Sequence, residues 1–181
     1  MTEIVTERLV LRPFVANDLP AFVAYRSEPE VARYQSWDTT YSRVDAESFL
    51  ASQHGAELGA PGGWVQLAAI VRRDGRLGGD CAVRVVDDQP ATGEVGVTFS
   101  PRYQGLGLAT EALAAVITTL FQEHDLHRVY AQADDRNLAV HRLLDRLGFR
   151  CEARLVEADW FKGAWSTLRV FAVLRREWES A

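Results

Sequence analysis

The most constraining feature of the sequence is a pair of glycines placed between a strand-like segment and a strong helical pattern. Residues 95–99 (Val-Gly-Val-Thr-Phe) read as a strand that Pro101 ends, and apolar residues then recur at helical spacing over 109–120. Because Gly105 and Gly107 form the turn, a ligand can approach the first N–H groups of the helix closely. The helix dipole adds positive potential there, so this order predicts an anion site, most often for phosphate.

Three phosphate-binding loops compete for this turn. A Walker loop has four residues between its glycines and Lys-Ser/Thr after the second, whereas Leu108 and Ala109 follow here. The dinucleotide fingerprint has a third glycine where Thr110 stands, and it opens the first βαβ unit rather than lying past the middle of the chain. The third pattern, Gln/Arg-x-x-Gly-x-Gly/Ala, is met by Gln104, Gly107 and Ala109. The loop alone is equally compatible with an ordinary helix-entry turn.

The composition indicates one globular domain. The chain has 181 residues, 48% hydrophobic and 25% charged, so it can bury a full core and we expect a single domain over 1–181. Its net charge of −5 lacks the basic footprint of a nucleic-acid binder, and no apolar run approaches the roughly 18 residues of a membrane span. The opening residues 1–4 lack the regions of a signal peptide, and Cys81 and Cys151 have no metal spacing. We expect a cytoplasmic protein with no metal, nucleic-acid or membrane partner.

The remaining pattern predicts a mixture of short strands and helices. The expected strands cover 8–13, 64–71, 77–86, a segment ending at Phe99, 128–133, 152–157 and 167–174. Besides the long helix, the expected helices begin at Asn17 or Asp18, at Ser42 and at Asn137. Asp74-Gly75 predicts a hairpin turn, and Gly78-Gly79 predicts a bulge or a close backbone approach. The early strands therefore form an antiparallel meander.

Two loops are unusually aromatic. Residues 34–41 hold Tyr34, Trp37 and Tyr41, and residues 160–165 place two Trp around a Lys162-Gly163 turn. These rings either cap the core or form a substrate wall. The wall is the favoured interpretation for the first loop, because polar loops do not gather large rings without cause.

Two longer motifs together carry a resemblance to a known family. The segment from Glu94 to Leu113 resembles the first signature of the GCN5-related N-acetyltransferases (GNAT), and Asn137 to Phe149 resembles the second. Residues 6–12 (Thr-Glu-Arg-Leu-Val-Leu-Arg) and the Lys162-Gly163-x-Trp165 motif look like the RimJ/RimL-type branch, which acetylates protein N-termini. The resemblance implies an α/β (α+β) fold with a mixed, mostly antiparallel seven-strand sheet. That sheet would be splayed between strands four and five and flanked by about four helices.

The resemblance also implies acetyl-CoA as cosubstrate. Its pantetheine arm would pair with the backbone of 95–99 inside the splay, and its pyrophosphate would bind the N–H groups of 104–110. The implied cofactor-binding residues are Val97, Thr98, Phe99, Gln104, Gly105, Leu106, Gly107, Leu108, Ala109, Thr110 and Asn137. Asn137 also reads as a plain helix cap, and the two roles are compatible.

Acetyl transfer to an amine requires removal of a proton and stabilisation of an oxyanion. Glu94 is the candidate catalytic base because it lies on the strand leading to the splay, and Asp80 is a second candidate. The alternative for each is a surface carboxylate at a strand edge. A backbone N–H near Val97 would stabilise the oxyanion. Leu144 and Val140 replace the Tyr and Ser that donate a proton in many relatives, so no general acid is assigned.

The expected function is therefore acetyl-CoA-dependent N-acetylation of a primary amine, either a protein or peptide N-terminus or a small molecule. The candidate amine-binding residues are Tyr34, Trp37, Asp80 and Trp160. The alternative is a non-catalytic acyl-CoA-binding sensor or interaction module, because both usual acids are missing. The strand from Trp165 to Val173 is also expected to offer an edge for pairing with a second copy, which would give a homodimer.

Overall fold

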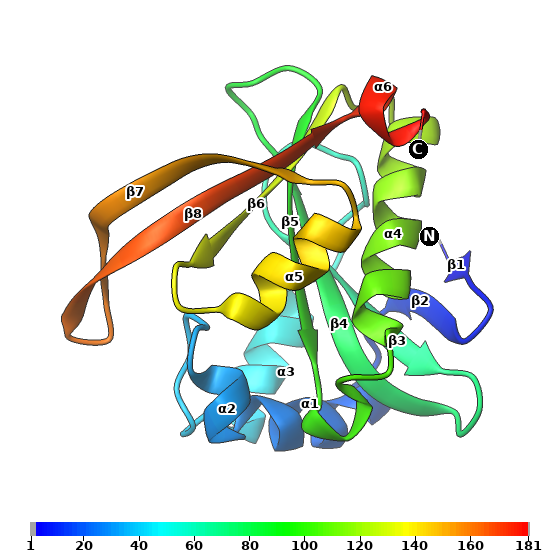
Figure 1. Cartoon of the computed structure of the whole chain (residues 1–181). Coiled ribbons are helices and arrows are strands. Elements are labelled where there is room, and N and C mark those ends of the chain that lie inside the picture. The colour runs from blue at the N-terminus through cyan, green and yellow to red at the C-terminus, as the bar shows by residue number, and fades with distance from the viewer. Residues whose placement is uncertain (1–2, 181) are drawn as a thin grey trace.

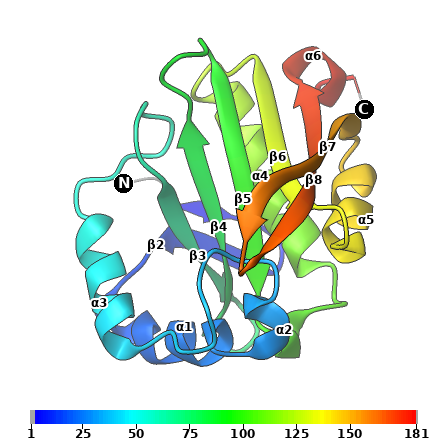
Figure 2. The same ribbon diagram turned by 90° about the vertical axis from the view of Figure 1, so that its left-hand side faces the viewer.

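The computed structural model describes residues 3–180, which form one mixed sheet with helices against both of its faces (Figures 1 and 2). Met1, Thr2 and Ala181, to which the expected domain and the expected lack of a signal peptide extend, lie outside the described residues. The strands are β1 (Ile4–Val5), β2 (Leu9–Pro13), β3 (Val65–Val71), β4 (Arg76–Val85), β5 (Thr92–Phe99), β6 (Arg128–Asp134), β7 (Arg150–Phe161) and β8 (Ala164–Leu174). The helices are α1 (Leu19–Arg26), α2 (Pro29–Ala32), α3 (Arg43–Ser52), α4 (Leu108–Gln122), α5 (Leu138–Arg146) and α6 (Arg175–Trp178), with short 3-10 turns η1 (Ala16–Asp18) and η2 (Pro101–Tyr103).

The sheet confirms the predicted fold class and splay. Its strand order is β1-β2-β3-β4-β5-β6-β8-β7, and only β5 and β6 pair in parallel. That parallel ladder holds three pairs, from Thr92 with Arg128 to Glu94 with Tyr130, and beyond it the two strands diverge. These are the fourth and fifth strands of the predicted seven. The eighth strand is the two-residue β1, which is too short to show a sequence pattern.

The predicted free edge on the last strand is wrong for most of that strand, and its pairing with a second copy stays a prediction. β8 pairs with β6 along Leu168 to Leu174 and with β7 from Ala164 to Ala172, so both of its edges are filled over 168–172. The closing hairpin inserts its second strand beside β6, which leaves β7 at the edge of the sheet. The order in which two hairpin strands enter a sheet cannot be derived from their sequence patterns.

Two cores fix the helices on opposite faces. The predicted apolar stripe of α4 packs on one face, where Leu113, Val116, Ile117 and Leu120 are fully buried or nearly so. On the other face α1 and α3 pack against the far ends of β3 and β4 in a core that includes Phe22. None of the helices among residues 3–180 is both long enough and apolar enough to span a bilayer.

The predicted bulge lies at Gly78. The β3–β4 register moves from Ala69 opposite Gly79 to Ile70 opposite Leu77, so Gly78 is the extra residue. A Cβ on Gly79 would lie 2.3 Å from the Thr98 carbonyl oxygen, which confirms the close backbone approach. Because of the bulge, Leu77 packs in the α1–α3 core while Cys81 packs in the α4 core. Asp80, next to Cys81, therefore faces α1.

Candidate active site

The loop between β5 and α4 presents a run of free backbone donors. Gly105 and Gly107 have φ values of 72° and 77°, and Gly107 begins α4 without a side-chain cap. Among residues 3–180, no backbone or side-chain acceptor receives a hydrogen bond from the N–H groups of 105–110. Six consecutive free donors therefore lie at the positive end of a 15-residue helix, which is the geometry an anion site needs, and anion binding there stays a prediction.

Arg8 lies beside this loop, although the sequence analysis assigned it no function. Its Nη1 donates to the Leu106 carbonyl at 2.8 Å, and its Nε donates to Glu111 at 2.5 Å. Burial raises the pKa of Glu111, but hydrogen bonds from Thr6 and Arg8 outweigh it and hold the pKa below its ordinary value. Arg8 thus keeps the Leu106 carbonyl turned toward itself and adds positive charge next to Gly107. Arg8 belongs to the motif of residues 6–12 noted in the sequence, but nothing in the sequence indicated that this motif lies beside α4.

Two of the predicted cofactor residues have structural roles for their side chains. The Gln104 amide donates to the Phe99 carbonyl at 2.8 Å and thereby holds the loop against the end of β5. Asn137 Oδ1 accepts the Val140 N–H at 3.3 Å, which confirms the predicted N-cap of α5. Their contacts with a cofactor remain predictions.

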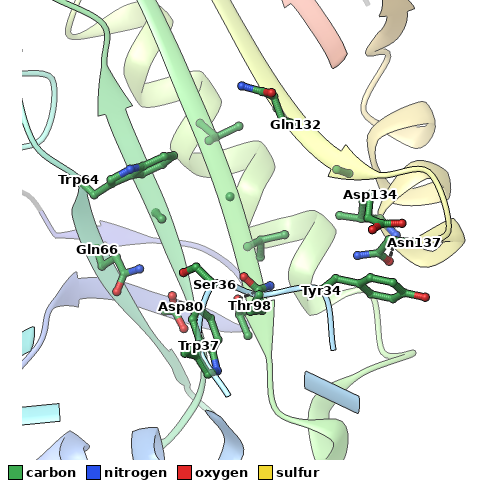
Figure 3. A pocket seen from close by; sticks show the side chains of 18 of the residues that line it. Tyr34, Ser36, Trp37, Trp64, Gln66, Asp80, Thr98, Gln132, Asp134 and Asn137 are labelled. Atoms are coloured by element: carbon green, nitrogen blue, oxygen red, sulfur yellow. Dashed lines mark hydrogen bonds between the residues drawn. The ribbon is translucent and has the colours of Figure 1, made fainter. Parts of the chain in front are cut away.

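The splay opens into a cavity of about 770 Å³ on the α1–α3 side of the sheet. Figure 3 shows Asp80, Trp37 and Thr98 at one end, with Asp134 and Asn137 on the wall formed by β6 and α5. The predicted site residues that line the cavity are Tyr34, Trp37, Asp80, Val97, Thr98 and Asn137. The predicted residues that do not line it are Glu94, Phe99, Trp160 and the loop residues 104–110.

The floor of the cavity is a pair of small residues between two polar pairs. Ala82 on β4 lies opposite Gly96 on β5, and both line the cavity. One step along the strands Asp80 lies opposite Thr98, and one step in the other direction Arg84 lies opposite Glu94. Side chains alternate along a strand, so all three pairs share one face of the sheet. The small side chains of this floor leave open space beside Asp80 and Thr98.

Asp80 is 2% exposed and is held from α1. Tyr25 OH donates to its Oδ1, and Arg26 Nη2 lies 3.7 Å from its Oδ2. The Arg26 guanidinium stacks on the rings of Trp37 and Phe22, 3.7 and 4.1 Å from their centroids. Burial raises the pKa of Asp80, although the charge of Arg26 and the hydrogen bond from Tyr25 act in the opposite direction.

Glu94 is surrounded by protein donors. Arg84 Nη2 and Tyr130 OH donate to its Oε2, the latter at 3.1 Å, and Gln132 Nε2 lies 3.4 Å from its Oε1. These partners come from β4 and β6. Glu94 therefore ties together the three strands at the last position where β5 and β6 still pair.

A strap formed by residues 32–38 crosses the cavity. Trp37 Nε1 donates to the Arg26 carbonyl at 3.1 Å, and Gln35 Nε2 donates to Thr98 Oγ1 at 3.3 Å. Lys162 Nζ reaches the strap from the tip of the β7–β8 hairpin and lies 2.8 Å from the Ala32 carbonyl, 2.7 Å from the Trp37 carbonyl and 3.0 Å from Asp38 Oδ1. The sequence predicted the Lys-Gly turn, whose φ values of 49° and 80° fit a type I′ hairpin, but not this contact.

Trp160 does not join the cavity because strand alternation turns it to the outer face of the hairpin. It is 62% exposed and packs edge-on against Trp165, with ring centroids 5.3 Å apart. Asp159, Phe161 and Ser166 take the inner positions and line the cavity. Ser166 is 4% exposed and its Oγ has no hydrogen-bond partner among residues 3–180. Ser166 could not be predicted from the sequence, because one Ser in a strand carries no signal.

The position expected for a general acid is apolar. Leu144 and Val140 of α5 both line the cavity, so neither replacement is compensated at its own position. Within residues 3–180, no cluster of three His, Cys, Asp or Glu side chains is arranged to hold a metal ion.

The chain thus combines a splayed sheet with free helix-start donors at one side and a cavity at the other. The family described as Acetyltransferase (GNAT) domain matches residues 8–150, and the chain belongs to this family. It is 27% identical over 178 residues to the uncharacterised N-acetyltransferase p20 of Bacillus licheniformis, covering 98% of this chain and 99% of the relative.

Solved structures show the same fold. An acetyltransferase of the GNAT family from Bacillus anthracis superposes with a TM-score of 0.87 at 25% identity, over 97% of this chain and 100% of the other. Spermidine N-acetyltransferase from Vibrio cholerae, in complex with CoA and spermine, has a TM-score of 0.82 at 17% identity, over 96% and 99% of the two chains.

Proposed function

We propose that this protein transfers the acetyl group of acetyl-CoA to a primary amine by direct attack on the thioester. The observation that carries the proposal is the pairing of two features on opposite sides of the splay. One is the run of six free N–H groups at 105–110, which suits a pyrophosphate, and the other is the polar cavity beside β5. Within residues 3–180, the edge of Val95 to Phe99 that faces β6 has no strand partner, and it suits an extended pantetheine arm.

In this reaction the chain would bind the diphosphate, orient the thioester and take a proton from the amine. The loop N–H groups and Arg8 hold the diphosphate, and the backbone of β5 places the thioester at the splay. A backbone N–H near Val97 stabilises the oxyanion. The proton of the attacking amine must go to a carboxylate, either to Asp80, which lines the cavity, or to Glu94, which does not line it and would act through water.

One observation favours the alternative of a non-catalytic acyl-CoA sensor. Val140 and Leu144 line the cavity without offering a proton to the departing sulfur. A thiol with an ordinary pKa of about 8.5 is nevertheless a tolerable leaving group as the thiolate, so their absence does not prevent transfer. Catalysis remains the better reading because the cavity provides room for an amine next to the cofactor strand.

The test is free-thiol release from acetyl-CoA in the presence of a panel of amines. The panel contains spermine, which binds a relative of the same fold, an alanyl-initiated peptide and glucosamine, with a reaction lacking amine as control. We expect amine-dependent turnover with at least one of them and an acetylated product of the corresponding mass. CoA binding without turnover of any amine, in a wider panel as well, would favour the sensor. Absence of CoA binding would contradict both readings.

A further inference from the structure

One oxygen of Asp80 is free of protein donors although the residue is buried. Oδ1 receives the hydroxyl of Tyr25, whereas Arg26 Nη2 lies 3.7 Å from Oδ2, beyond hydrogen-bond distance. No other donor within residues 3–180 bonds to Oδ2. Because Asp80 lines the cavity, this oxygen is available to a ligand that brings its own N–H.

The register of the sheet places Asp80 next to the expected reacting atoms. Asp80 lies directly opposite Thr98, the neighbour of Val97, at which the thioester is expected. The small pair Ala82 and Gly96 lies one step away on the same face. An amine resting on this floor would therefore have the thioester on one side and Asp80 at its end.

The groups around Asp80 leave its carboxylate more basic than that of an ordinary aspartate. Tyr25 and Arg26 face it from α1, and Tyr41 is the further titratable group on that side. Its strand partners, Thr98 on β5 and Ala68 on β3, carry no charge. Burial favours the proton, and the guanidinium held by the Trp37 ring limits that effect.

We propose that Asp80 is the catalytic residue that accepts the proton of the amine, an inference that rests on the proposed acetyl transfer. One ammonium proton passes to Oδ2, and the neutral nitrogen attacks the thioester carbonyl. The C–N bond forms and the C–S bond breaks as the tetrahedral intermediate collapses. A second proton of the nitrogen passes to the departing sulfur, the third stays on the amide, and Asp80 returns its proton to solvent.

Glu94 has the opposite arrangement. Both of its oxygens face donors from Arg84, Tyr130 and Gln132, and it does not line the cavity. Its role is to hold the end of the parallel ladder. The two carboxylates therefore differ in environment: Asp80 has an oxygen open to a substrate, whereas both oxygens of Glu94 face protein donors.

The first experiment compares Asp80→Asn with Glu94→Gln in kcat/KM for the best amine of the panel, between pH 5 and 9. General-base catalysis is typically worth about 10²-fold to 10⁴-fold, so we expect Asp80→Asn to lose that much while its affinity for CoA is retained. Glu94→Gln should leave the acid limb of the kcat/KM profile where it is in the wild type, because that limb is expected to report Asp80. Asp88→Asn, in the exposed turn after β4, is the matched amide control. An Asp80→Asn rate within threefold of wild type overturns the inference.

A second variant covers the case in which Asp80→Asn leaves the buried Arg26 without a carboxylate partner and does not fold. Tyr25→Phe removes a hydrogen bond that lowers the pKa of Asp80, so the acid limb of kcat/KM should move to higher pH. An unmoved limb overturns the role of Asp80 while leaving acetyl transfer intact. Absence of wild-type turnover would instead overturn the proposed function, and with it this inference.

Discussion

Gly107 concentrates two requirements in one residue. Its φ of 77° is a left-handed conformation that costs an L-residue roughly 1–2 kcal/mol. A Cβ there would also lie 3.4 Å from Arg8 Nη2, next to the donors that face the proposed diphosphate. A side chain at this position would strain the loop and push against Arg8 at the same time.

We therefore expect Gly107→Val to weaken CoA binding by about tenfold or more, since every 1.4 kcal/mol is a factor of ten in affinity. Calorimetric titration with CoA measures the effect. Gly148→Val is the matched control, because Gly148 has a φ of 76° at the end of α5 and open space around it. Both variants should lose stability through backbone strain. Equal CoA affinities of the two would contradict the placement of the diphosphate.

At the residue scale the sequence predicted what local chemistry determines. Gly107 at the start of α4 and the Asn137 side chain as the cap of α5 follow from short-range rules, and both are confirmed. Tyr25 and Arg26 escaped notice because an amphipathic helix with an aromatic and a basic residue is ordinary. Only the bulge at Gly78, which turns Asp80 toward α1, makes them part of the site.

At the scale of elements, the β7–β8 hairpin is an arm that passes beyond the end of β6 (Figure 1). β6 ends at Asp134, opposite Leu168, so β8 residues 164–167 pair with β7 alone. Lys162 at the tip then joins this arm to the strap, and the two segments supply facing parts of the cavity wall. Lys162 thereby couples the positions of two segments that are more than a hundred residues apart in the chain.

Lys162→Met should loosen both segments without affecting the cofactor loop. One hydrogen bond to a charged group is worth about 1.5–3 kcal/mol, so we expect amide hydrogen exchange in 33–38 and 156–166 to rise roughly tenfold or more. Mass-spectrometric exchange of the free protein measures this, with 105–120 as the internal reference.

Asp38→Asn is the matched control for that measurement. It removes only the ionic partner of Lys162 and leaves the bonds to the Ala32 and Trp37 carbonyls, so its effect should be small because Asp38 is largely exposed. Lys162→Arg should retain most of the protection. If amide hydrogen exchange in 33–38 and 156–166 rises equally in Lys162→Met and Asp38→Asn, the contacts of Lys162 with the two carbonyls do not hold the strap.

The sequence placed the closing hairpin but underestimated its length. Strands were expected over 152–157 and 167–174, whereas β7 and β8 span 150–161 and 164–174. The ladder shifts register between Leu155 and Asp159, and the extra residues break the alternation that predicts a strand. Beyond the shift, the pair of Trp160 and Trp165 continues the ladder to the turn. The divergence of β5 and β6 was predicted only from the family resemblance, because a strand pattern does not indicate where pairing with a parallel neighbour ends.

At the scale of the whole molecule, carboxylates paired with arginine connect segments that are distant in sequence. Neighbouring donors that include arginines hold the pKa of several of them below the ordinary value, namely Asp74, Glu111, Asp134, Asp135, Glu152 and Glu177. Glu111 joins the N-terminal segment to α4, and Glu152 joins β7 to Arg128 of β6. A carboxylate with a lowered folded pKa stabilises the fold above its unfolded pKa and loses that contribution as pH falls.

Asp135 is the sharpest case, because hydrogen bonds from Arg154 and Arg169 lower its pKa to about 2. An unfolded aspartate has a pKa of about 3.9, so the stability contributed by Asp135 is complete above that pH and is lost as pH falls toward 2.

We expect the melting temperature to drop steeply between about pH 4 and pH 2. Asp135→Asn should flatten part of that drop and lower the melting temperature at pH 7. Asp88→Asn, an exposed carboxylate in a turn, should leave the profile as it is. A wild-type slope in Asp135→Asn would show that the two arginines do not tie the β6–α5 turn to the hairpin in solution. The same turn leads into α5 through Asn137, so loosening it should also reach the wall of the cavity that faces Asp80.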